Sequence, residues 1–342
     1  MSRLRILAGV AAILLVAASG TGYLGWRLSS ATGEAAAGLD LSRTGSLLYV
    51  EAGSGRVRQA PMTGGPADAG DAGGPGNAGG PGVGGRPGDA VGSAYAVGPA
   101  FGAGPVCQRV AAGGGTLACL RATAVPMASE LDITPAAGER RTLQLWGNPS
   151  RVRVSASGAL VGWTVFRTGD TYLVPGAFAT TAGIFDLRTG AHHGSLEDFT
   201  TYLDGKPYAA VDRNFWGVTF APDDRTFYAT MATAGKTWLM RGDLSAGRMT
   251  AIRQNVECPS ISPDGTRIAY KFRTGKNWRL HVLDLASGRD VALADPDHVD
   301  VQPAWLDEQT VAYGKKGAVY AVPADGSGTP HHLVDGSSPS VP

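Results

Sequence analysis

No run of residues in the sequence has the type and spacing of a known catalytic motif. There is no Gly-x-Ser-x-Gly elbow, no His-Glu-x-x-His, no Ser-x-x-Lys and no P-loop. Residues 74–79 do match Gly-x-Gly-x-x-Gly. A dinucleotide site, however, needs a strand before this motif and a helix after it, and here Pro81 and further glycines follow. The sequence therefore predicts no catalytic residue and no cofactor.

Histidines and acidic residues are the next candidates, because they are common metal ligands. His192 and His193 are adjacent, as are His331 and His332. Neighbouring residues on a strand point to opposite sides, so we expect surface histidines and not a two-ligand metal site. Residues 295–300 include three aspartates, whose oxygens suit Ca²⁺, but they lack the EF-hand spacing and glycine. A solvated loop is the favoured interpretation, and no metal site is predicted.

The three cysteines permit one disulfide bond. Cys107 and Cys119 flank a predicted hairpin around Gly113, where they could pair across adjacent strands. A shift of one residue in strand register would instead place the two thiols on opposite faces of the sheet. The sequence leaves both arrangements open. Cys258 is left over and is expected to be a buried thiol.

A repeated pattern of short β-type segments and turns predicts the elements that position these residues. The best copy is Cys258–Tyr270, in which two β-type runs flank Ser-Pro-Asp-Gly at 262–265. Proline presets φ, aspartate caps the turn and glycine accepts a positive φ, so this copy predicts a β-hairpin. Further copies, some of them weaker, run over 217–228, 152–160, 303–313, 110–119 and 41–50. A second turn signature follows at 185–190, 242–247, 283–288, 322–326 and 133–138.

Two signatures in a fixed order indicate four-stranded units. Markers in the six hairpin copies stand at positions 43, 112, 156, 222, 263 and 306, so they are separated by 69, 44, 66, 41 and 43 residues. The basic period of about 42 residues is the length of a propeller blade. Six copies predict an all-β, six-bladed β-propeller. The segment Ser338–Val341 has the pattern of a first strand, and we expect it to complete the first blade and close the ring.

The hairpin repeats resemble those of the TolB-like β-propeller family, whose WD40-like repeats carry a Ser-Pro-Asp-Gly hairpin. The resemblance covers about residues 39–342 and is strongest over Ser260–Tyr270. It implies a propeller fold, an extracytoplasmic location and a role as a binding partner in the cell envelope. Similar repeats also occur as accessory propellers of serine peptidases, so the motif is specific for the fold and weak for function.

The N-terminus has the features of an export signal. A short basic segment precedes Ile6–Trp26, a run of 21 uncharged residues that could span a bilayer as an apolar helix at about 1.5 Å per residue. The same run also fits a signal peptide with a small-residue cleavage site. We therefore assign residues 1–27 to a signal peptide or signal anchor, 28–38 to a linker and 39–342 to the propeller. Either alternative exports the propeller, which is then membrane-anchored or secreted.

Two insertions lengthen the repeat. Residues 64–90 contain 12 glycines and four prolines and are expected to form a disordered loop. The other insertion is split between 167–181 and 199–213, and antiparallel geometry predicts that both parts surround the channel mouth. Aromatic and arginine side chains on exposed loops are typical of a recognition surface, although the alternative is that these aromatics pack the insertions onto the blades. The candidate partner-binding residues are Tyr172, Tyr202, Asp204, Arg213 and Trp216.

The charges nearly cancel, with 30 Lys and Arg against 29 Asp and Glu, which argues against a basic surface for nucleic acid. The sequence therefore predicts an exported, non-catalytic propeller that binds an envelope or secreted protein. Two alternatives stay open. One is a propeller enzyme, such as a glycan lyase or hydrolase, whose site at the channel mouth is assembled from scattered blade residues. The other is a small-ligand or cation-binding sensor.

Overall fold

The computed structural model describes residues 38–65, 95–169, 171–172 and 177–342. The predicted signal peptide or anchor at 1–27, most of the linker at 28–38 and most of the glycine-rich loop at 64–90 lie outside the described residues. Within the described part of the chain, no helix is long and apolar enough to cross a membrane.

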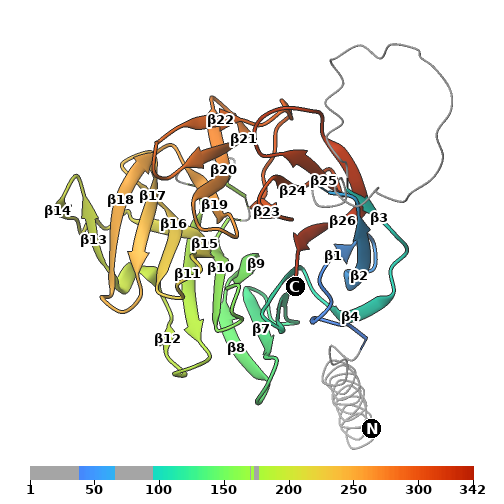
Figure 1. The fold of residues 1–342 in the computed structure, drawn as a ribbon. Coiled ribbons are helices and arrows are strands. Elements are labelled where there is room, and N and C mark those ends of the chain that lie inside the picture. The colour runs from blue at the N-terminus through green and yellow to red at the C-terminus, as the bar shows by residue number, and fades with distance from the viewer. Residues whose placement is uncertain (1–37, 66–94, 170, 173–176) are drawn as a thin grey trace, which may run out of the picture.

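The described strands pair into sheets that are arranged around a common centre (Figure 1). Three of these sheets have four antiparallel strands each. The first consists of β5 (Arg109–Gly113), β6 (Thr116–Ala122), β7 (Ala128–Thr134) and β8 (Arg141–Trp146). The second consists of β9 (Asn148–Val154), β10 (Leu160–Thr168), β11 (Ala179–Asp186) and β12 (His192–His193). The third consists of β19 (Glu257–Ile261), β20 (Arg267–Thr274), β21 (Asn277–Asp284) and β22 (Asp290–Ala292).

The remaining strands form two larger sheets. The six-stranded sheet contains β15 (Asn214–Phe220), β16 (Thr226–Thr233), β17 (Lys236–Asp243) and β18 (Arg248–Gln254), followed at its edge by β13 (Thr200–Leu203) and β14 (Lys206–Pro207). The eight-stranded sheet contains β23 (Ala304–Trp305), β24 (Thr310–Lys315), β25 (Ala318–Pro323), β26 (His331–Ser340), β1 (Ser46–Glu51), β2 (Arg56–Thr63), β3 (Ala96–Val97) and β4 (Gly102–Val106). Only the single 3₁₀ turn η2 (Leu196–Asp198) is helical among the described residues, which confirms the all-β class.

The repeated hairpin forms as its turn residues predict. β19 and β20 pair antiparallel, with Ile261 opposite Ile268. Between them, the Gly265 N–H donates to the Ser262 carbonyl at 2.9 Å, and Gly265 has a φ of +74° that favours glycine. The Asp264 carboxylate accepts a hydrogen bond from the Thr266 N–H at 3.0 Å. Local turn chemistry therefore sets the register of this repeat.

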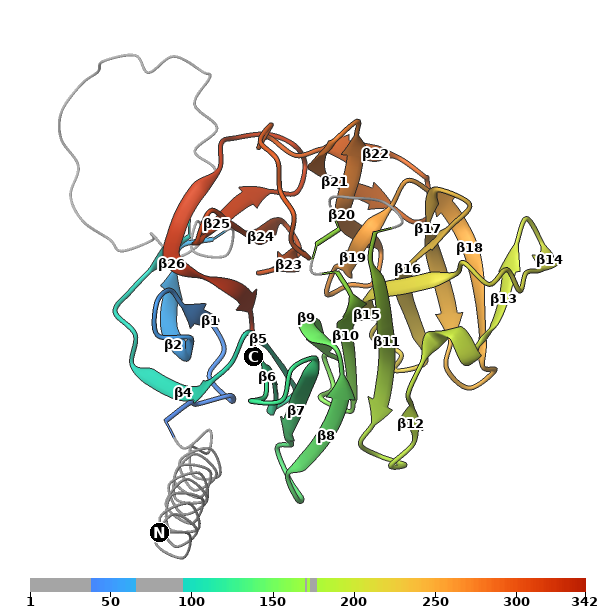
Figure 2. The ribbon, with the colours of Figure 1, turned by 180° about the vertical axis from the view of Figure 1, so that it is seen from behind.

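The last strand connects the two ends of the described body. The first half of β26 pairs with β25, with Asp335 opposite Ala318, and its second half pairs with β1, with Ser340 opposite Leu48. The Ser340 hydroxyl also accepts a hydrogen bond from the Ala112 N–H of β5 at 3.0 Å. Both views show the C-terminus near the centre of the ring of sheets (Figures 1 and 2). The expected return of the C-terminal strand to the first unit is therefore present, and it pairs a strand edge that would otherwise be exposed.

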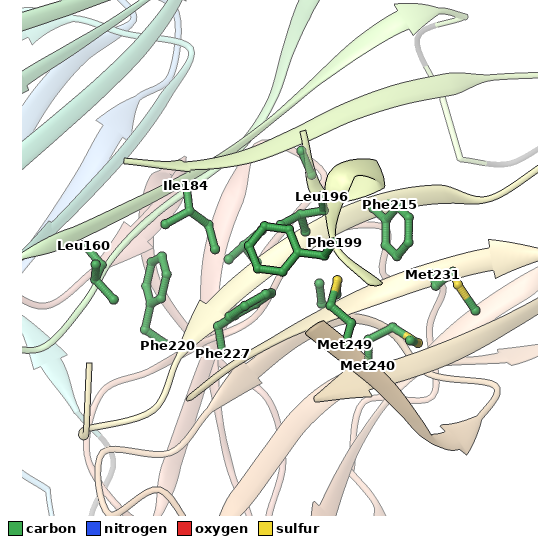
Figure 3. Close-up of a cluster of buried hydrophobic side chains, with 13 residues drawn as sticks. Leu160, Ile184, Leu196, Phe199, Phe215, Phe220, Phe227, Met231, Met240 and Met249 are labelled. Carbon is green, nitrogen blue, oxygen red and sulfur yellow. The ribbon is translucent and has the colours of Figure 1, made fainter. Parts of the chain in front are cut away.

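Hydrophobic side chains fill the space between neighbouring sheets. In the cluster of Figure 3, Phe199 and Phe227 are buried, and their ring centroids lie 5.5 Å apart in an edge-to-face arrangement. Burial of each such side chain contributes about 1.5–3 kcal/mol. Gly242 of β17 lies against Phe227, and a Cβ atom at this position would collide with the ring. Phe199 and Leu196 come from the connection after β12, so part of that insertion belongs to the core.

A disulfide bond joins Cys107 and Cys119, whose Cα atoms are 5.5 Å apart. Cys107 lies between β4 and β5, whereas Cys119 lies in β6 opposite Val110. Of the two arrangements that the sequence left open, the structure has the bonded one. Cys258 is a free thiol and is buried, as expected.

The disulfide should stabilise the propeller measurably. In the chain-entropy model, closing a loop between cysteines 12 residues apart contributes about 3 kcal/mol. We expect a Cys107→Ala/Cys119→Ala variant to lose about that much free energy of unfolding in a urea titration. Thiol titration of the denatured, unreduced protein should detect only Cys258, with Cys258→Ala as the control that detects none. Three reactive thiols in the unreduced protein would contradict the bond.

Candidate functional site

The structure buries two of the predicted partner-binding residues. Tyr172 is 2% exposed and Trp216 is 1% exposed. Their ring centroids lie 5.3 Å apart, and both rings contact Phe178, at 5.0 and 5.4 Å. Of the two arrangements that the sequence left open for these aromatics, exposure on loops and packing onto the blades, Tyr172 and Trp216 have the packed one. Tyr172 and Phe178 pack the described residues of the insertion onto the strands, because a long connection needs its own apolar contacts.

Tyr202 and Asp204 lie elsewhere in the molecule. β13 pairs in parallel with β18, with Thr200 opposite Arg248, so it extends the outer edge of the six-stranded sheet (Figures 1 and 2). Asp204 and Gly205 both have positive φ angles, +51° and +73°, and form the two-residue turn that joins β13 to β14. The prediction that 199–213 surrounds the channel mouth is wrong for this part. The free edge of β18 instead supplied backbone hydrogen-bonding groups for it to pair with.

Arg213 lies in the segment between β14 and β15. Its Nε–H donates to the Ala210 carbonyl and an Nη–H donates to the Thr201 hydroxyl, both at 3.0 Å. Arg213 and Trp216 line a groove of about 700 Å³, to which three sheets contribute. The five predicted residues are thus not gathered on one surface, and only these two line this groove.

The groove combines apolar and cationic side chains. Val211 is fully exposed beside it, and Phe178 contributes an aromatic wall. Among the described residues, no carboxylate lies within 4.0 Å of the cations of Arg213 or Lys236. Asp212, the acidic side chain of the groove, accepts hydrogen bonds from Thr233 and from the backbone of residue 234 at 2.7 Å, which lower its pKa. The groove is therefore apolar at its wall and positively charged at its rim.

Val211 and Lys236 were not found from the sequence. They are separated along the chain and belong to no motif, and only the fold brings them to one groove. One feature of the sequence could have indicated the groove: Val211 is an apolar residue two positions before Arg213, in an insertion rich in aromatic residues.

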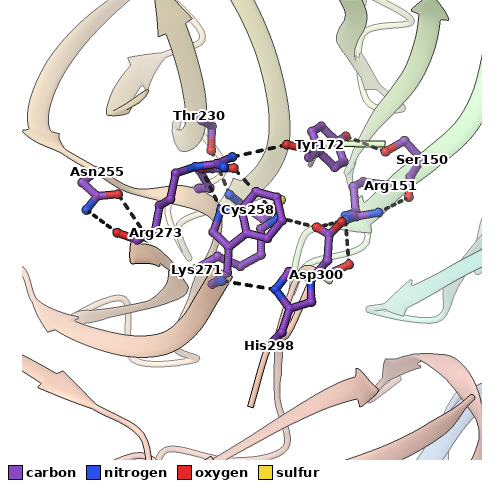
Figure 4. A network of polar contacts seen from close by, with 12 residues as sticks. Ser150, Arg151, Tyr172, Thr230, Asn255, Cys258, Lys271, Arg273, His298 and Asp300 are labelled. Carbon is purple, nitrogen blue, oxygen red and sulfur yellow. Dashed lines mark hydrogen bonds and ion pairs between the residues drawn. The ribbon is translucent and has the colours of Figure 1, made fainter. Parts of the chain in front are cut away.

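A network of buried charges lies next to the groove (Figure 4). Lys271 of β20 is completely buried, with its Nζ atom 2.6 Å from Asp300 Oδ1 and 4.1 Å from the centre of the Trp278 ring. Arg273, which also lines the groove, donates to the Glu257 carboxylate at 2.9 Å, and Trp278 Nε1–H donates to the same oxygen at 2.8 Å. Lys271 and Arg273 thus each have a carboxylate partner, which is the condition for burying charge.

Tyr172 connects this network to the centre of the ring. Its ring lies 5.1 Å from Lys271 Nζ and 5.1 Å from the Arg151 guanidinium. Its backbone carbonyl accepts a hydrogen bond from Arg273 at 3.2 Å, and its hydroxyl bonds with the Ser150 hydroxyl at 2.5 Å. Burial raises the pKa of Tyr172 well above its ordinary value. Tyr172 is therefore a neutral side chain between cations, held by packing and hydrogen bonds.

No protein-family model matches the chain, and no curated protein sequence matches it. Among solved structures, TolB from Acinetobacter baumannii is similar with a TM-score of 0.53 at 14% identity, over 88% of this chain and 67% of that chain. A chain of the nidogen/laminin complex is similar with a TM-score of 0.51 at 11% identity, over 86% of this chain and 97% of that chain. The chain has a TolB-like β-propeller fold. At these identities the likeness establishes the fold, and function has to be argued from the site.

The acidic segment 295–300 of the propeller is neutralised by lysines. Lys315 Nζ pairs with Asp295 at 2.5 Å and with Asp297 at 3.2 Å, while Asp300 pairs with Lys271. In the described part of the chain, no group of three or more His, Cys, Asp and Glu side chains is placed to hold a metal ion. His192 and His193 lie on the edge strand β12, and His331 and His332 lie at the start of β26, where it pairs with β25. His192, His331 and His332 are exposed and His193 is partly exposed.

The pair of the completely buried Lys271 and the partly exposed Asp300 should be important for stability. Removing the Asp300 carboxylate leaves the buried ammonium with only Glu257, at 3.9 Å, so we expect Asp300→Asn to lower the free energy of unfolding by about 3 kcal/mol. The matched control is Asp297→Asn, in the same loop. Its carboxylate is 55% exposed, so its loss should cost less than about 1 kcal/mol. Equal effects of the two variants in urea titrations would contradict the assignment.

The same pair predicts a pH dependence. Burial opposes ionisation of Asp300, but the charges of Lys271 and Arg151 outweigh it and hold the pKa of this carboxyl below its usual value. A carboxyl with a lowered pKa stabilises the fold above its unfolded pKa, and this contribution is lost as the pH falls through its folded pKa. Wild-type stability should therefore decline below about pH 4, and the decline should be shallower in Asp300→Asn. Parallel pH profiles would exclude this role.

Proposed function

We propose that the chain is an exported, six-bladed β-propeller that binds another protein of the cell envelope through the groove. The observation that carries the proposal is the combination, in one groove, of an exposed apolar side chain with cations that have no carboxylate partner among the described residues. Protein-binding surfaces commonly combine apolar anchors with arginine in this way.

The count of six blades is supported by the pairing pattern. Each of the three four-stranded sheets and the core of the six-stranded sheet makes one blade. The eight-stranded sheet divides at β26, because its two halves pair with β25 and with β1. One blade then consists of β23, β24, β25 and the first half of β26, and another of the second half of β26 with β1, β2 and β4. This count agrees with the six hairpin copies of the sequence.

Export is supported by two independent features. The N-terminal segment has a basic start and a long uncharged run, as expected for a signal peptide or an anchor. The Cys107–Cys119 disulfide is a bond that persists in oxidising compartments outside the cytosol. The proposed location is therefore extracytoplasmic, either anchored to the membrane or secreted.

The charges of the groove favour an acidic segment of the partner. Arg213 and Lys236 offer positive charge at the rim, and Phe178 and Val211 offer apolar surface. Trp216 also lines the groove, but its Nε1–H is buried and has no acceptor among the described residues. A peptide segment that carries a carboxylate next to an apolar side chain matches these groups. The described residues give no specific observation in favour of a reaction, so no catalysis is proposed.

Site-specific crosslinking tests the groove. A photo-crosslinking phenylalanine derivative in place of Val211 should give one defined adduct with an envelope protein in cells. The same derivative in place of Ile252, which is 46% exposed on β18 outside the groove, should not. Adducts that are identical at both positions would show that the groove is not the binding surface.

The partner identified in this way can then be used in a quantitative test. Arg213→Glu reverses a charge at the rim and should weaken binding at least about tenfold, with a steeper loss at low salt. Arg248→Glu makes the same change on the exposed face of β18 and should leave the affinity unchanged. Trp216→Ala is unsuitable here, because that buried side chain supports the fold. Unchanged affinity of Arg213→Glu in isothermal titration would overturn the proposal.

A further inference from the structure

Three arginines face one small cavity at the centre of the propeller. Arg109 begins β5, and Arg151 and Arg153 lie two residues apart on β9, so both point to the same side of that strand. Together they line a cavity of about 110 Å³, whose opposite wall includes Gln302 and Ser338. Since a water molecule occupies about 30 Å³ of liquid, this space accommodates a small ion with a few waters.

The guanidinium groups of this cavity are close to one another. The Ser150 carbonyl oxygen accepts hydrogen bonds from both Arg109 Nε–H, at 2.7 Å, and Arg151 Nη1–H, at 2.9 Å. One carbonyl dipole is thus shared by two positive charges, and the other backbone acceptors of these groups are the carbonyls of Gln108, at 2.8 Å from Arg109, and Asp300, at 3.5 Å from Arg151. Arg153 donates to the Pro303 carbonyl, which is likewise neutral.

Carboxylates do not balance these charges. Among the described residues, none lies within 4.0 Å of the guanidinium of Arg109 or Arg153, and Arg151 approaches Asp300 only at 3.9 Å. Asp300 is already the partner of Lys271 at 2.6 Å. The buried Nε–H of Arg151 has no acceptor in the described part of the chain. The cavity therefore contains at least two uncompensated positive charges and an unused donor.

Like charges at this spacing raise the free energy of the folded state. Burial, followed by repulsion from Arg151, lowers the pKa of Arg109 to about 10, and the same two causes lower the pKa of Arg153 to about 10. All three side chains still carry their charge at neutral pH. A cavity of this kind binds anions favourably, because an anion removes the repulsion and accepts the unused hydrogen bonds.

We propose that this cavity is a binding site for a small oxyanion, held by the guanidinium groups of Arg109, Arg151 and Arg153. Guanidinium forks match the oxygen spacing of phosphate, sulfate and carboxylate groups, and Ser338 can add a hydroxyl donor. The site is separate from the groove and shares none of its lining residues. The proposed site would therefore bind an anionic ligand independently of the protein partner.

Thermal unfolding and titration calorimetry of the full chain test this site. Inorganic phosphate and sulfate form one arm, acetate and citrate form the other, and sodium chloride at matched ionic strength is the reference. We expect a saturable rise in the unfolding midpoint of about 5 °C with an anion of one arm, beyond the effect of chloride. The arm that responds identifies the ligand as a phosphate-like or a carboxylate group. No response beyond chloride in either arm would overturn the site.

Substitutions of the arginines test whether the anion-dependent rise in the unfolding midpoint arises from binding in this cavity. Arg153→Gln and Arg109→Gln should each weaken binding of the responding anion at least about tenfold, while their stability in chloride alone stays equal to wild type or rises because repulsion is relieved. Arg225→Gln, a change in an exposed ion pair with Asp243, is the matched control and should keep the response. If a glutamine variant does not fold, Arg153→Lys keeps the charge but loses the fork, and should also bind more weakly. An undiminished response in the Arg109→Gln/Arg153→Gln double variant, or in Arg153→Lys, would disprove the assignment.

Discussion

The pairing of β26 with both β25 and β1 is the interaction on which the rest of the structure depends. It joins strands from opposite ends of the described body, so no sheet edge of this junction is left to pair with another chain. Closure also brings the first strands β5, β9, β15 and β19 to face one another around a common centre (Figure 2). Polar side chains that are buried on those strands must then find their partners across the centre.

The network around Lys271 shows how far that requirement is met. Arg273 pairs with Glu257 of the neighbouring strand β19 in its own sheet, whereas Lys271 pairs with Asp300 in the segment before β23, so this second contact also links two sheets. Arg109 of β5 and Arg153 of β9 lack such carboxylate partners among the described residues and donate to backbone carbonyls instead. The closed fold thus contains a region around Lys271 in which the charges are paired, and a cavity in which Arg109 and Arg153 have no carboxylate partner among the described residues. The proposed anion would bind in this cavity.

Local features of the fold were predictable and the placement of the insertions was not. The hairpin at Asp264 and Gly265 depends on turn chemistry within four residues, and the repeat of that chemistry predicted the sheets. The positions of Tyr172 and Tyr202 depend on which apolar surface and which strand edge remain free after the sheets have formed. That information is spread over the whole chain, which is why the sequence left open whether these aromatics are exposed or packed onto the blades. The groove was missed for the same reason, since its residues come from three sheets.

The near-zero net charge of the chain hides a separation of charge within the fold. Repeated turns use aspartates such as Asp223, Asp264 and Asp284 as hydrogen-bond acceptors for backbone N–H groups, and these bonds help to lower the pKa of each carboxyl. Those carboxylates are committed to the turns between strands and are not available to the centre. Because the totals of acidic and basic residues are nearly equal, fewer carboxylates remain to pair with cations elsewhere in the described part of the chain. A balanced composition therefore argues against an extended basic surface, but it is compatible with a local excess of positive charge around Arg109 and Arg153 and around Arg213 and Lys236.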